Sequence, residues 1–302
     1  MRVLILGAGG IIGQHLRVSR PAWVYAWYTR RKNGLCDFEY GRDSLDELLD
    51  AANPAVVINL AGENRPDVVE RDPGRYRDVN VVLPAVLSRW ATKTRNHLIQ
   101  VSSQAVFGGY PNLATGMPSL KDFMPPYSPN SARMPVNQYG LQKLMAEGEV
   151  MAGGDRWTIV RPTFVLGVRP FPDFGRENPV EQMLAPTAIA LEGETAGTQR
   201  QVCDRWFSVS FAWDVAAKLW EIAQGELRKT IHVGIPYRTN RHVIASYLRP
   251  DINIEAVSHD SFPGLAPRPI DTTYAGEGSF AQIAEGLDRC KAEYEARELT
   301  AK

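Results

Sequence analysis

The fold is decided by the start of the chain, where residues 2–13 read RVLILGAGGIIG. Residues 2–6 form an apolar, β-branched-rich run, as expected of a strand that is buried on both faces. Glycines follow at positions 7, 10 and 13, and a short helical pattern continues through Leu16. Such glycines let the backbone turn tightly and approach a pyrophosphate, while the helix N-terminus offers N–H donors. The stretch predicts a dinucleotide-binding βα unit, and a plain βα turn is the alternative.

Outward from this unit, apolar runs alternate with helical patterns. Further strands are predicted at residues 23–28, 36–38, 55–60, 97–101, 157–160 and 230–233. Helices are predicted at residues 43–52, over 67–92 as one long or two broken helices, from 139 to 153, and at 211–224. This alternation predicts an α/β fold with a doubly wound, parallel Rossmann sheet.

The predicted organisation has two parts. Residues 1–165, with roughly 207–235, are assigned to the Rossmann domain that binds the coenzyme. Residues 166–206 and 236–302 are assigned to a smaller C-terminal α+β lobe that binds the substrate and ends in a charged helix at 279–298. A length of 302 residues suits one large domain or two such lobes.

Composition excludes several classes of protein. Lysine and arginine together number 34, as do aspartate and glutamate, so no basic excess points to nucleic acid. No apolar run approaches the roughly 20 residues that cross a bilayer. The three cysteines are scattered without a CxxC pair, and the five histidines lack metal-ligand spacing. We therefore expect a cytoplasmic protein without a metal, a membrane segment or a nucleic-acid partner, and the sequence leaves a homodimer open.

The end of the second predicted strand bears on the choice of coenzyme. At this position an acid binds the 2′-hydroxyl of NAD, whereas arginine accommodates the 2′-phosphate of NADP. Arg30 and Arg31 stand where the acid would be. We therefore expect NADP(H), with NAD(H) as the second option, and a solvated basic loop is the alternative reading. Asp37 is the predicted acceptor for the adenine amino group.

Tyr139 and Lys143 stand four residues apart on one face of a predicted helix. A free phenol has a pKa of about 10, and a neighbouring lysine cation favours the phenolate and lowers that pKa. The pair could then exchange a proton with the oxygen of a carbonyl/alcohol couple. Ser103 follows the strand predicted at 97–101, at the sheet edge where open α/β sheets bind ligands. A chance spacing is the alternative explanation for the tyrosine and the lysine.

Several motifs occur in one order along the chain. They are Gly7…Gly10…Gly13, Asn59-Leu60-Ala61-Gly62, Asn80, residues 102–108 (SSQAVFG), Tyr139…Lys143 and Arg161-Pro162-Thr163. Because it contains these motifs in this order, the chain resembles the extended short-chain dehydrogenases/reductases. Residues 126–129 (PYSP) and 266–269 (APRP) make it similar, more narrowly, to the dTDP-4-dehydrorhamnose reductase family.

The resemblance implies an NADPH-dependent oxidoreductase that reduces the C4 carbonyl of a nucleotide-linked 4-keto-6-deoxy sugar. It implies that Tyr139 is the general acid, that Lys143 lowers the pKa of Tyr139 and binds the nicotinamide ribose, and that Ser103 donates to the carbonyl. Asn80 would be structural or part of a proton relay. The predicted coenzyme contacts are Gly7, Gly10, Ile11, Ile12, Gly13, Arg30, Arg31, Asp37, Phe38, Leu60, Ala61, Gly62, Asn80, Tyr139, Lys143 and Pro162.

The predicted contacts to the sugar nucleotide are Glu63, Asn64, Gln104, Arg205 and Arg268. The two arginines would pair with the diphosphate, since a guanidinium matches phosphate bidentately, and surface arginines are the alternative.

The residues near Ser103 bear on the other functions that the resemblance allows. Gln104 and Ala105 stand where dehydratases need acids, and no cysteine lies nearby as in the epimerase-reductases that make fucose nucleotides. Two alternatives to a reductase stay open. One is an NAD(P)-dependent nucleotide-sugar epimerase, which keeps its coenzyme bound. The other is a non-catalytic regulatory subunit that binds NADP as a structural ligand.

Overall fold

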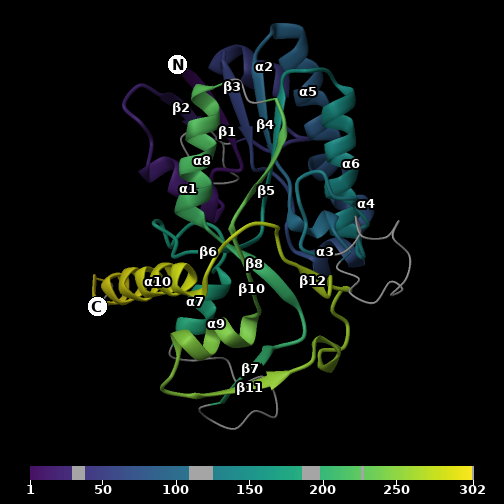
Figure 1. Cartoon of the computed structure of the whole chain (residues 1–302). Helices are drawn as coiled ribbons and strands as arrows, with labels where there is room; N and C mark the ends of the chain where they lie inside the picture. Colours follow the sequence, from purple (N-terminus) through teal and green to yellow (C-terminus); the bar gives the residue numbers. More distant parts are fainter. Residues whose placement is uncertain (29–37, 109–124, 186–197, 226–227, 301–302) are drawn as a thin grey trace.

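The computed structural model describes residues 1–28, 38–108, 125–185, 198–225 and 228–300. A sheet of six strands, all paired in parallel, forms the centre of the larger part of the molecule (Figure 1). Its spatial order is β2 (Tyr25–Tyr28), β1 (Arg2–Leu6), β3 (Val56–Asn59), β4 (His97–Val101), β5 (Trp157–Pro162) and β9 (Thr230–Val233). The doubly wound parallel sheet predicted from the sequence is confirmed.

Helices cover both faces of this sheet (Figure 1). One face carries α1 (Ile11–Val18) and α8 (Ala212–Gln224), and the other carries α2 (Leu45–Ala52), α5 (Leu83–Thr94) and α6 (Gln138–Ala152). Successive strand residues point to opposite faces, so β1 serves two cores. Val3 and Ile5 pack with the first pair of helices, and Leu4 and Leu6 pack with the other three.

The strand order places a topological switch point between β1 and β3. From β1 the chain runs outward to β2, and then crosses to the other side of β1 for β3. Ligands of open α/β sheets bind outside the carboxyl ends of the strands at such a point. The loops that follow Leu6 and Asn59 therefore mark the expected site.

The helical stretch after β3 is more divided than the sequence predicts. It contains α3 (Pro66–Arg71), α4 (Pro73–Arg77), a π-helical turn (Asp78–Val82) and α5. Pro84 does not break this path, because it lies in the first turn of α5, where a backbone N–H is not needed for the helix. The π-helical turn carries Asn80 inward, where it is 1% exposed.

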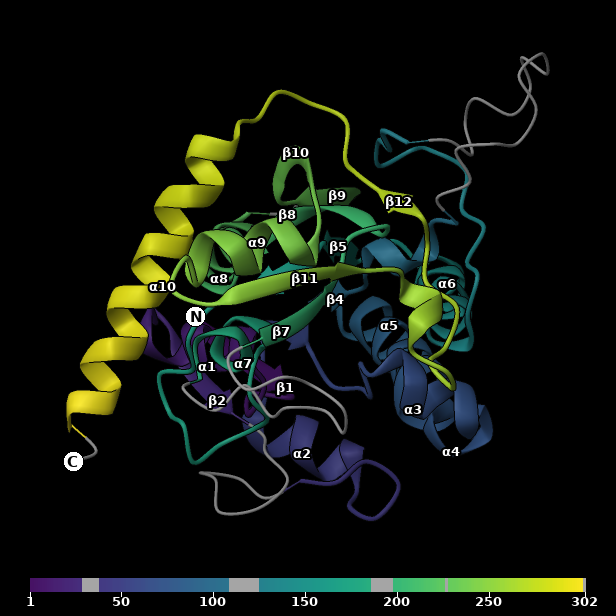
Figure 2. The same ribbon diagram turned by 90° about the horizontal axis from the view of Figure 1, so that it is seen from below.

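The smaller lobe has its own sheets and core. Strand β8 (Trp206–Phe211) pairs with β6 (Phe164–Leu166), β10 (Ile235–Thr239) and β12 (Asp271–Thr272), while β7 (Thr198–Val202) pairs with β11 (Asn253–Val257). The lobe's helices are α7 (Pro179–Leu184), α9 (Arg241–Leu248) and α10 (Phe280–Thr300). Figure 2 shows α10 along the outer side of this lobe. These elements make up a smaller α+β part with sheets of its own; β8 belongs to it, and the chain returns to the large sheet at α8.

Some predictions fall on residues that the structure does not describe. Arg30, Arg31 and Asp37 lie outside the described residues, as does most of the strand predicted at 36–38. Phe38 is described, and its side chain packs against the core that contains α2. In the part of the chain that is described, no helix is long and apolar enough to cross a membrane.

Candidate active site

The glycine loop after β1 has the tight geometry that its sequence predicts. Gly7 has φ +80°, and a Cβ there would lie 2.7 Å from the backbone N of Ala61. A Cβ on Gly13 would lie 2.5 Å from Ala8 Cα, so only glycine lets α1 pack this closely on the loop. At Gly10, by contrast, the nearest atom would be 3.6 Å away. The loop is therefore packed against protein at Gly7 and Gly13 and open at Gly10, as a cradle for a phosphate group requires.

The other predicted coenzyme contacts lie around the same edge of the sheet. Ile12 and Leu60 pack partly against the core beneath α1 and α8, and Ala61 packs against the core on the opposite face. A Cβ added at Gly167, which follows β6, would lie 3.2 Å from Ile11 Cδ1. Pro162 is buried at the end of β5. Ile11, Ile12, Leu60, Ala61 and Pro162 thus lie in the segments that end or follow β1, β3 and β5.

Asn80 fixes the loop that follows β3. Its side-chain oxygen accepts from the Glu63 backbone N at 2.9 Å, and its amide nitrogen donates to Glu63 O at 3.2 Å and to Gln142 Oε1 at 2.8 Å. A Cβ on Gly62 would lie 2.6 Å from the Asn80 oxygen. Both amide N–H donors are therefore used within the protein, which fits the structural role of Asn80 and ties this loop to α6.

Tyr139 and Lys143 project from the first turns of α6. The helix begins after Asn137, whose side chain accepts from Gly140 N at 2.8 Å. Tyr139 is 8% exposed and Lys143 is 7% exposed. Lys143 Nζ donates to Val101 O at 3.3 Å and lies 5.9 Å from the centre of the Tyr139 ring. Lys143 therefore faces the carboxyl end of β4 beside Gly62, and the Tyr139 ring lies next to it.

Ser103 completes the predicted trio. It caps a short 3₁₀ turn over residues 104–106, and its hydroxyl accepts from Ala105 N at 3.1 Å. The same side chain forms a hydrogen bond with Tyr139. The structure therefore brings the serine, tyrosine and lysine together.

Electrostatics correct one detail of the sequence prediction. Burial raises the pKa of Tyr139 to about 12, although the hydrogen bond with Ser103 lowers it. Burial also lowers the pKa of Lys143 to about 8, while the nearby Glu147 carboxylate raises it. The net pKa of the phenol is therefore raised and not lowered, because loss of hydration around the phenol outweighs the other influences. At neutral pH the tyrosine holds its proton and the lysine is charged.

Gly140 is a site residue that the sequence analysis missed. A Cβ at this position would lie 2.2 Å from Ala105 O and 2.9 Å from Pro135 Cβ. The glycine therefore lets α6 approach the turn that carries Ser103. The signal was present in the sequence, since a glycine directly follows the tyrosine, but its neighbours come from segments distant along the chain.

Glu147 is a second missed residue, one helical turn beyond Lys143. It is fully buried, and its carboxylate accepts hydrogen bonds from Arg161 Nε and Nη2, each at 2.7 Å. It also accepts from Ser102 Oγ at 2.6 Å and from Arg133 Nη1 at 2.9 Å. Burial alone would raise the pKa of this carboxyl, but its bonds to Arg161, Ser102 and Arg133 hold the pKa below the ordinary value. The ion pair fastens α6 to the end of β5.

The predicted sugar-nucleotide contacts are found in two groups. Glu63 is bound by Arg65 and lies 3.5 Å from Arg176 Nη2, which donates to Asn64 Oδ1 at 2.6 Å. Burial alone would raise the pKa of Glu63, but the two arginines lower it. Gln104 Oε1 is buried and has no hydrogen-bond partner among the described residues. Gln104 follows Ser103 in the chain, and the Glu63 carboxylate is close enough to the Tyr139 phenol to raise its pKa.

The two predicted diphosphate ligands are already paired with carboxylates. Arg268 donates to Asp67 Oδ2 at 2.7 Å, and Arg205 pairs with Asp204 and Asp260. The loop that carries Arg268 is held near the start of α6, because Asn137 Nδ2 donates to Pro267 O at 2.7 Å. Arg268 therefore lies near the start of α6, the helix that carries Tyr139 and Lys143. The partners of Arg205, by contrast, belong to the smaller lobe.

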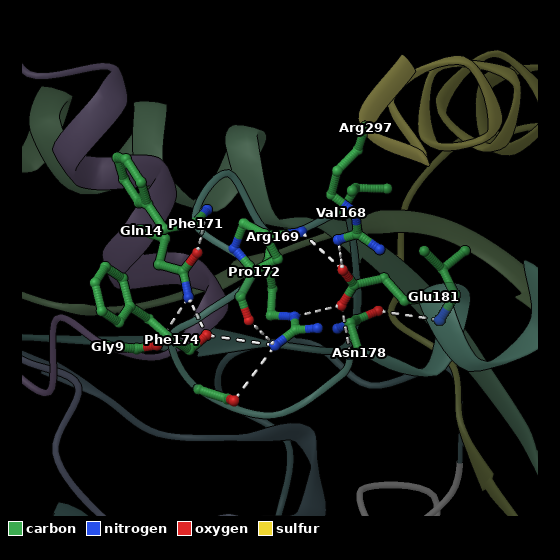
Figure 3. A network of polar contacts seen from close by, with 12 residues as sticks. Gly9, Gln14, Val168, Arg169, Phe171, Pro172, Phe174, Asn178, Glu181 and Arg297 are labelled. Carbon is green, nitrogen blue, oxygen red and sulfur yellow. Dashed lines mark hydrogen bonds and ion pairs between the residues drawn. The ribbon is translucent and has the colours of Figure 1, made fainter. Parts of the chain in front are cut away.

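A segment of the smaller lobe lies against the glycine loop (Figure 3). Gln14 Nε2 donates to Gly9 O at 3.0 Å and to Phe174 O at 2.8 Å, and its oxygen accepts from Phe171 N at 2.9 Å. Arg169 is bound to Glu181 at 2.8 Å, and Glu181 also pairs with Arg297 of α10. No regular pattern is evident in this segment from the sequence, and the contacts that hold it to the glycine loop come from Gln14, more than 150 residues earlier in the chain.

Comparison with known proteins places this geometry in a family. The model for the RmlD substrate binding domain matches residues 1–281. A dTDP-4-dehydrorhamnose reductase of Mycolicibacterium smegmatis is 27% identical over 288 residues, covering 92% of this chain and 79% of that protein. Methionine adenosyltransferase 2 subunit beta of Xenopus tropicalis is 30% identical over 177 residues, which cover 55% of this chain and 47% of that protein.

Among solved structures, a dTDP-4-dehydrorhamnose reductase from Bacillus anthracis in complex with NADP superposes with a TM-score of 0.74. It is 20% identical in sequence, and the match covers 97% of this chain and 99% of that one. This likeness concerns the fold, and it extends over both lobes. With the family model matching all but the last 21 residues, the chain belongs to the RmlD substrate-binding domain family.

Proposed function

We propose that this chain is an NADPH-dependent oxidoreductase that reduces the C4 carbonyl of a nucleotide-linked 4-keto-6-deoxy sugar. The observation that carries the proposal is the trio of Ser103, Tyr139 and Lys143 at the carboxyl edge of the sheet, in which the tyrosine and the lysine are buried. Membership of the RmlD family and the similarity to dTDP-4-dehydrorhamnose reductases support it. The presence of Arg30 and Arg31 in the sequence, and the NADP in the Bacillus anthracis relative, support NADP(H) over NAD(H).

The residues at the switch point fit a dinucleotide. The open position above Gly10 leaves room for a phosphate group, and the N-terminus of α1 directs N–H groups toward it. Gly62 allows a close approach beside Lys143, since a Cβ there would lie 3.9 Å from Lys143 Nζ. When bound, the reduced nicotinamide supplies a hydride. The protein's own side chains carry out the remaining chemistry.

Tyr139 is proposed to protonate the carbonyl oxygen as it becomes an alkoxide. A phenol with a pKa of about 12 holds its proton at neutral pH, so it is in the form required of a general acid. Ser103 donates a hydrogen bond to the same oxygen and stabilises the developing negative charge. Lys143, charged below a pKa of about 8, stabilises the phenolate that remains after the transfer. Solvent then restores the phenol proton.

The experiment is to mix the purified protein with NADPH and a panel of 4-keto sugar nucleotides. A reductase consumes one NADPH for each alcohol formed. An epimerase yields an isomerised sugar without net loss of NADPH, which would contradict the proposal. A binding protein retains NADPH and leaves every sugar unchanged, and this result would also contradict it.

Tyr139→Phe tests the proton donor. We expect a loss in turnover of about a hundredfold or more, because general acid catalysis contributes factors of roughly 10² to 10⁴. Affinity for NADPH, measured by fluorescence titration, should stay near the wild-type value, which shows that the site is intact. Normal turnover by a folded Tyr139→Phe variant would remove the mechanism.

A second candidate function has a specific observation in its favour. The chain is 30% identical over 177 residues to methionine adenosyltransferase 2 subunit beta, whose name describes a subunit. A non-catalytic partner protein with this fold is therefore the competing proposal. It predicts that NADPH binds without any sugar reduction and that Tyr139→Phe changes nothing measurable.

A further inference from the structure

The segment from Val168 to Asn178, here called the crossing segment, links the two lobes at the glycine loop (Figure 3). It leaves the smaller lobe after β6 and enters α7, and between these elements it packs on α1. Gln14, which is 1% exposed, uses its oxygen and its nitrogen to hold the backbone at Phe171 and Phe174. Arg169 Nη1 donates a hydrogen bond to Pro172 O at 2.9 Å, which holds the same stretch from the other side. The path of the crossing segment is therefore fixed by side chains from both lobes.

The crossing segment approaches the glycine loop most closely at Gly175. This residue has φ +75°, and a Cβ there would lie 2.6 Å from Gly9 O and 3.5 Å from Gln14 Nε2. Only glycine fits both the backbone conformation and the contact. The next residue, Arg176, therefore starts beside the loop that is proposed to hold the diphosphate.

The side chain of Arg176 extends from there to the loop after β3. Its Nη2 donates to Asn64 Oδ1 at 2.6 Å and lies 3.5 Å from Glu63 Oε1. The loop after β3 includes Gly62, beside Lys143. The side chain of Arg176 thus runs from a backbone beside the glycine loop to the loop after β3, and these two loops flank the switch point where dinucleotides bind.

Arg176 is held loosely enough to change partners. Its side chain is 53% exposed, and its link to Glu63 is long for a charge-assisted hydrogen bond. Glu63 has a better partner in Arg65, whose Nε and Nη2 donate at 2.9 and 2.6 Å. Glu63 therefore stays paired when Arg176 turns away. Burial lowers the pKa of Arg176 and Glu63 raises it, so the cation is partly desolvated where it lies.

We propose that Arg176 is a ligand of the coenzyme diphosphate, delivered by the crossing segment. This inference rests on the proposed function for the presence of a dinucleotide. On binding, the guanidinium moves from Glu63 and Asn64 to the diphosphate oxygens, which accept its forked N–H groups bidentately. The glycine loop supplies N–H groups and a helix dipole, and Arg176 supplies the full positive charge.

The test measures binding without catalysis. Dissociation constants for NADPH, NADH and ADP-ribose are determined by calorimetry for the wild type, Arg176→Gln and Arg65→Gln. All three ligands carry the diphosphate, and only NADPH carries the 2′-phosphate. We expect Arg176→Gln to weaken all three by a similar factor of about ten or more, since charged hydrogen bonds contribute that much. Arg65→Gln leaves Glu63 to Arg176 alone, so it should weaken binding by no more than a few-fold, because Arg176 is still present to reach the diphosphate.

Three results would overturn the inference. Equal losses in the Arg176 and Arg65 variants would mean that only the general charge near Glu63 matters. A loss confined to NADPH would place Arg176 at the 2′-phosphate, and no loss would remove it from the site. Thermal unfolding of the ligand-free variants should match that of the wild type, because Arg176 is exposed. If the wild type binds none of the three ligands, the proposed function fails together with this inference; binding that does not depend on Arg176 overturns this inference alone.

Discussion

Lys143 carries its charge in a place that disfavours charge. Burial lowers its pKa from 10.5 to about 8, and Glu147, four residues further along α6, opposes that shift. A cation is still present at neutral pH, which is what a phenolate neighbour requires. The same shift has a consequence for stability: the unfolded chain binds this proton more tightly, so the contribution of Lys143 to folding improves as the pH rises from about 8 to 10.5.

The pH dependence of catalysis follows from this residue. We expect kcat/KM for reduction to fall above about pH 8, by about tenfold per pH unit, as Lys143 loses its proton. Tyr139, with a pKa of about 12, should not titrate in this range. Lys143→Arg should lose the alkaline limb, because a guanidinium keeps its proton. A wild-type profile that stays flat well above pH 8, or a limb that persists in Lys143→Arg, would contradict this role.

At the scale of the element, α6 has two glycines with opposite roles. Gly140→Ala should push the helix from the turn that carries Ser103, since the new Cβ would lie 2.2 Å from Ala105 O. We expect a loss of about 1–3 kcal/mol in unfolding free energy and a lower kcat. Gly148→Ala in the same helix is the matched control, because nothing lies within 4 Å of its Cβ position. That variant should be neutral or more stable by up to about 1 kcal/mol, and a loss of similar size in both would refute the packing argument.

The junction between α6 and β5 makes a separate prediction. Glu147→Gln leaves the guanidinium of Arg161, which is 1% exposed, without its counter-charge. We expect a loss of about 3–5 kcal/mol in unfolding free energy, measured by urea denaturation. Arg133→Gln removes a partner of the same carboxylate that is 32% exposed, and should cost less than about 1 kcal/mol. Similar losses in the two variants would show that the buried pair is not the main fastening of α6.

At the scale of the whole molecule, the alternation of strands and helices around the large sheet could be predicted from the sequence. Apolar runs such as residues 2–6 are long enough, and the glycines after them specific enough, to indicate a doubly wound sheet with its site at the strand ends. Tyr139 and Lys143 could be paired because helical spacing relates residues that are close in sequence. Ser103 was found because it follows a recognisable strand.

What the sequence could not provide are the contacts between distant segments. Gly140 matters because of Ala105 O, and Gln14 because of Phe174 O, 160 residues further along the chain. The upward pKa shift of Tyr139 arises from burial, which depends on the packed structure and not on the Lys143 spacing. Glu147 could have been noticed in the sequence, since it lies eight residues after Tyr139 and shares the helix face of Tyr139 and Lys143. From the sequence alone, however, a carboxylate at this position is expected to be solvated, because its contact with Arg161 depends on the fold.

The link between Arg176 and Glu63 has a kinetic consequence. While Arg176 lies against Glu63 and Asn64, two residues predicted to hold the sugar are engaged by a cation of the protein. If the dinucleotide draws Arg176 away, the Asn64 oxygen becomes free for a sugar hydroxyl only after the dinucleotide has arrived, while Glu63 stays paired with Arg65. The protein should then follow a compulsory order of addition, coenzyme before sugar, which product-inhibition patterns would reveal. Random addition would mean that Arg176 does not block the binding of the sugar, and that the sugar contacts lie elsewhere.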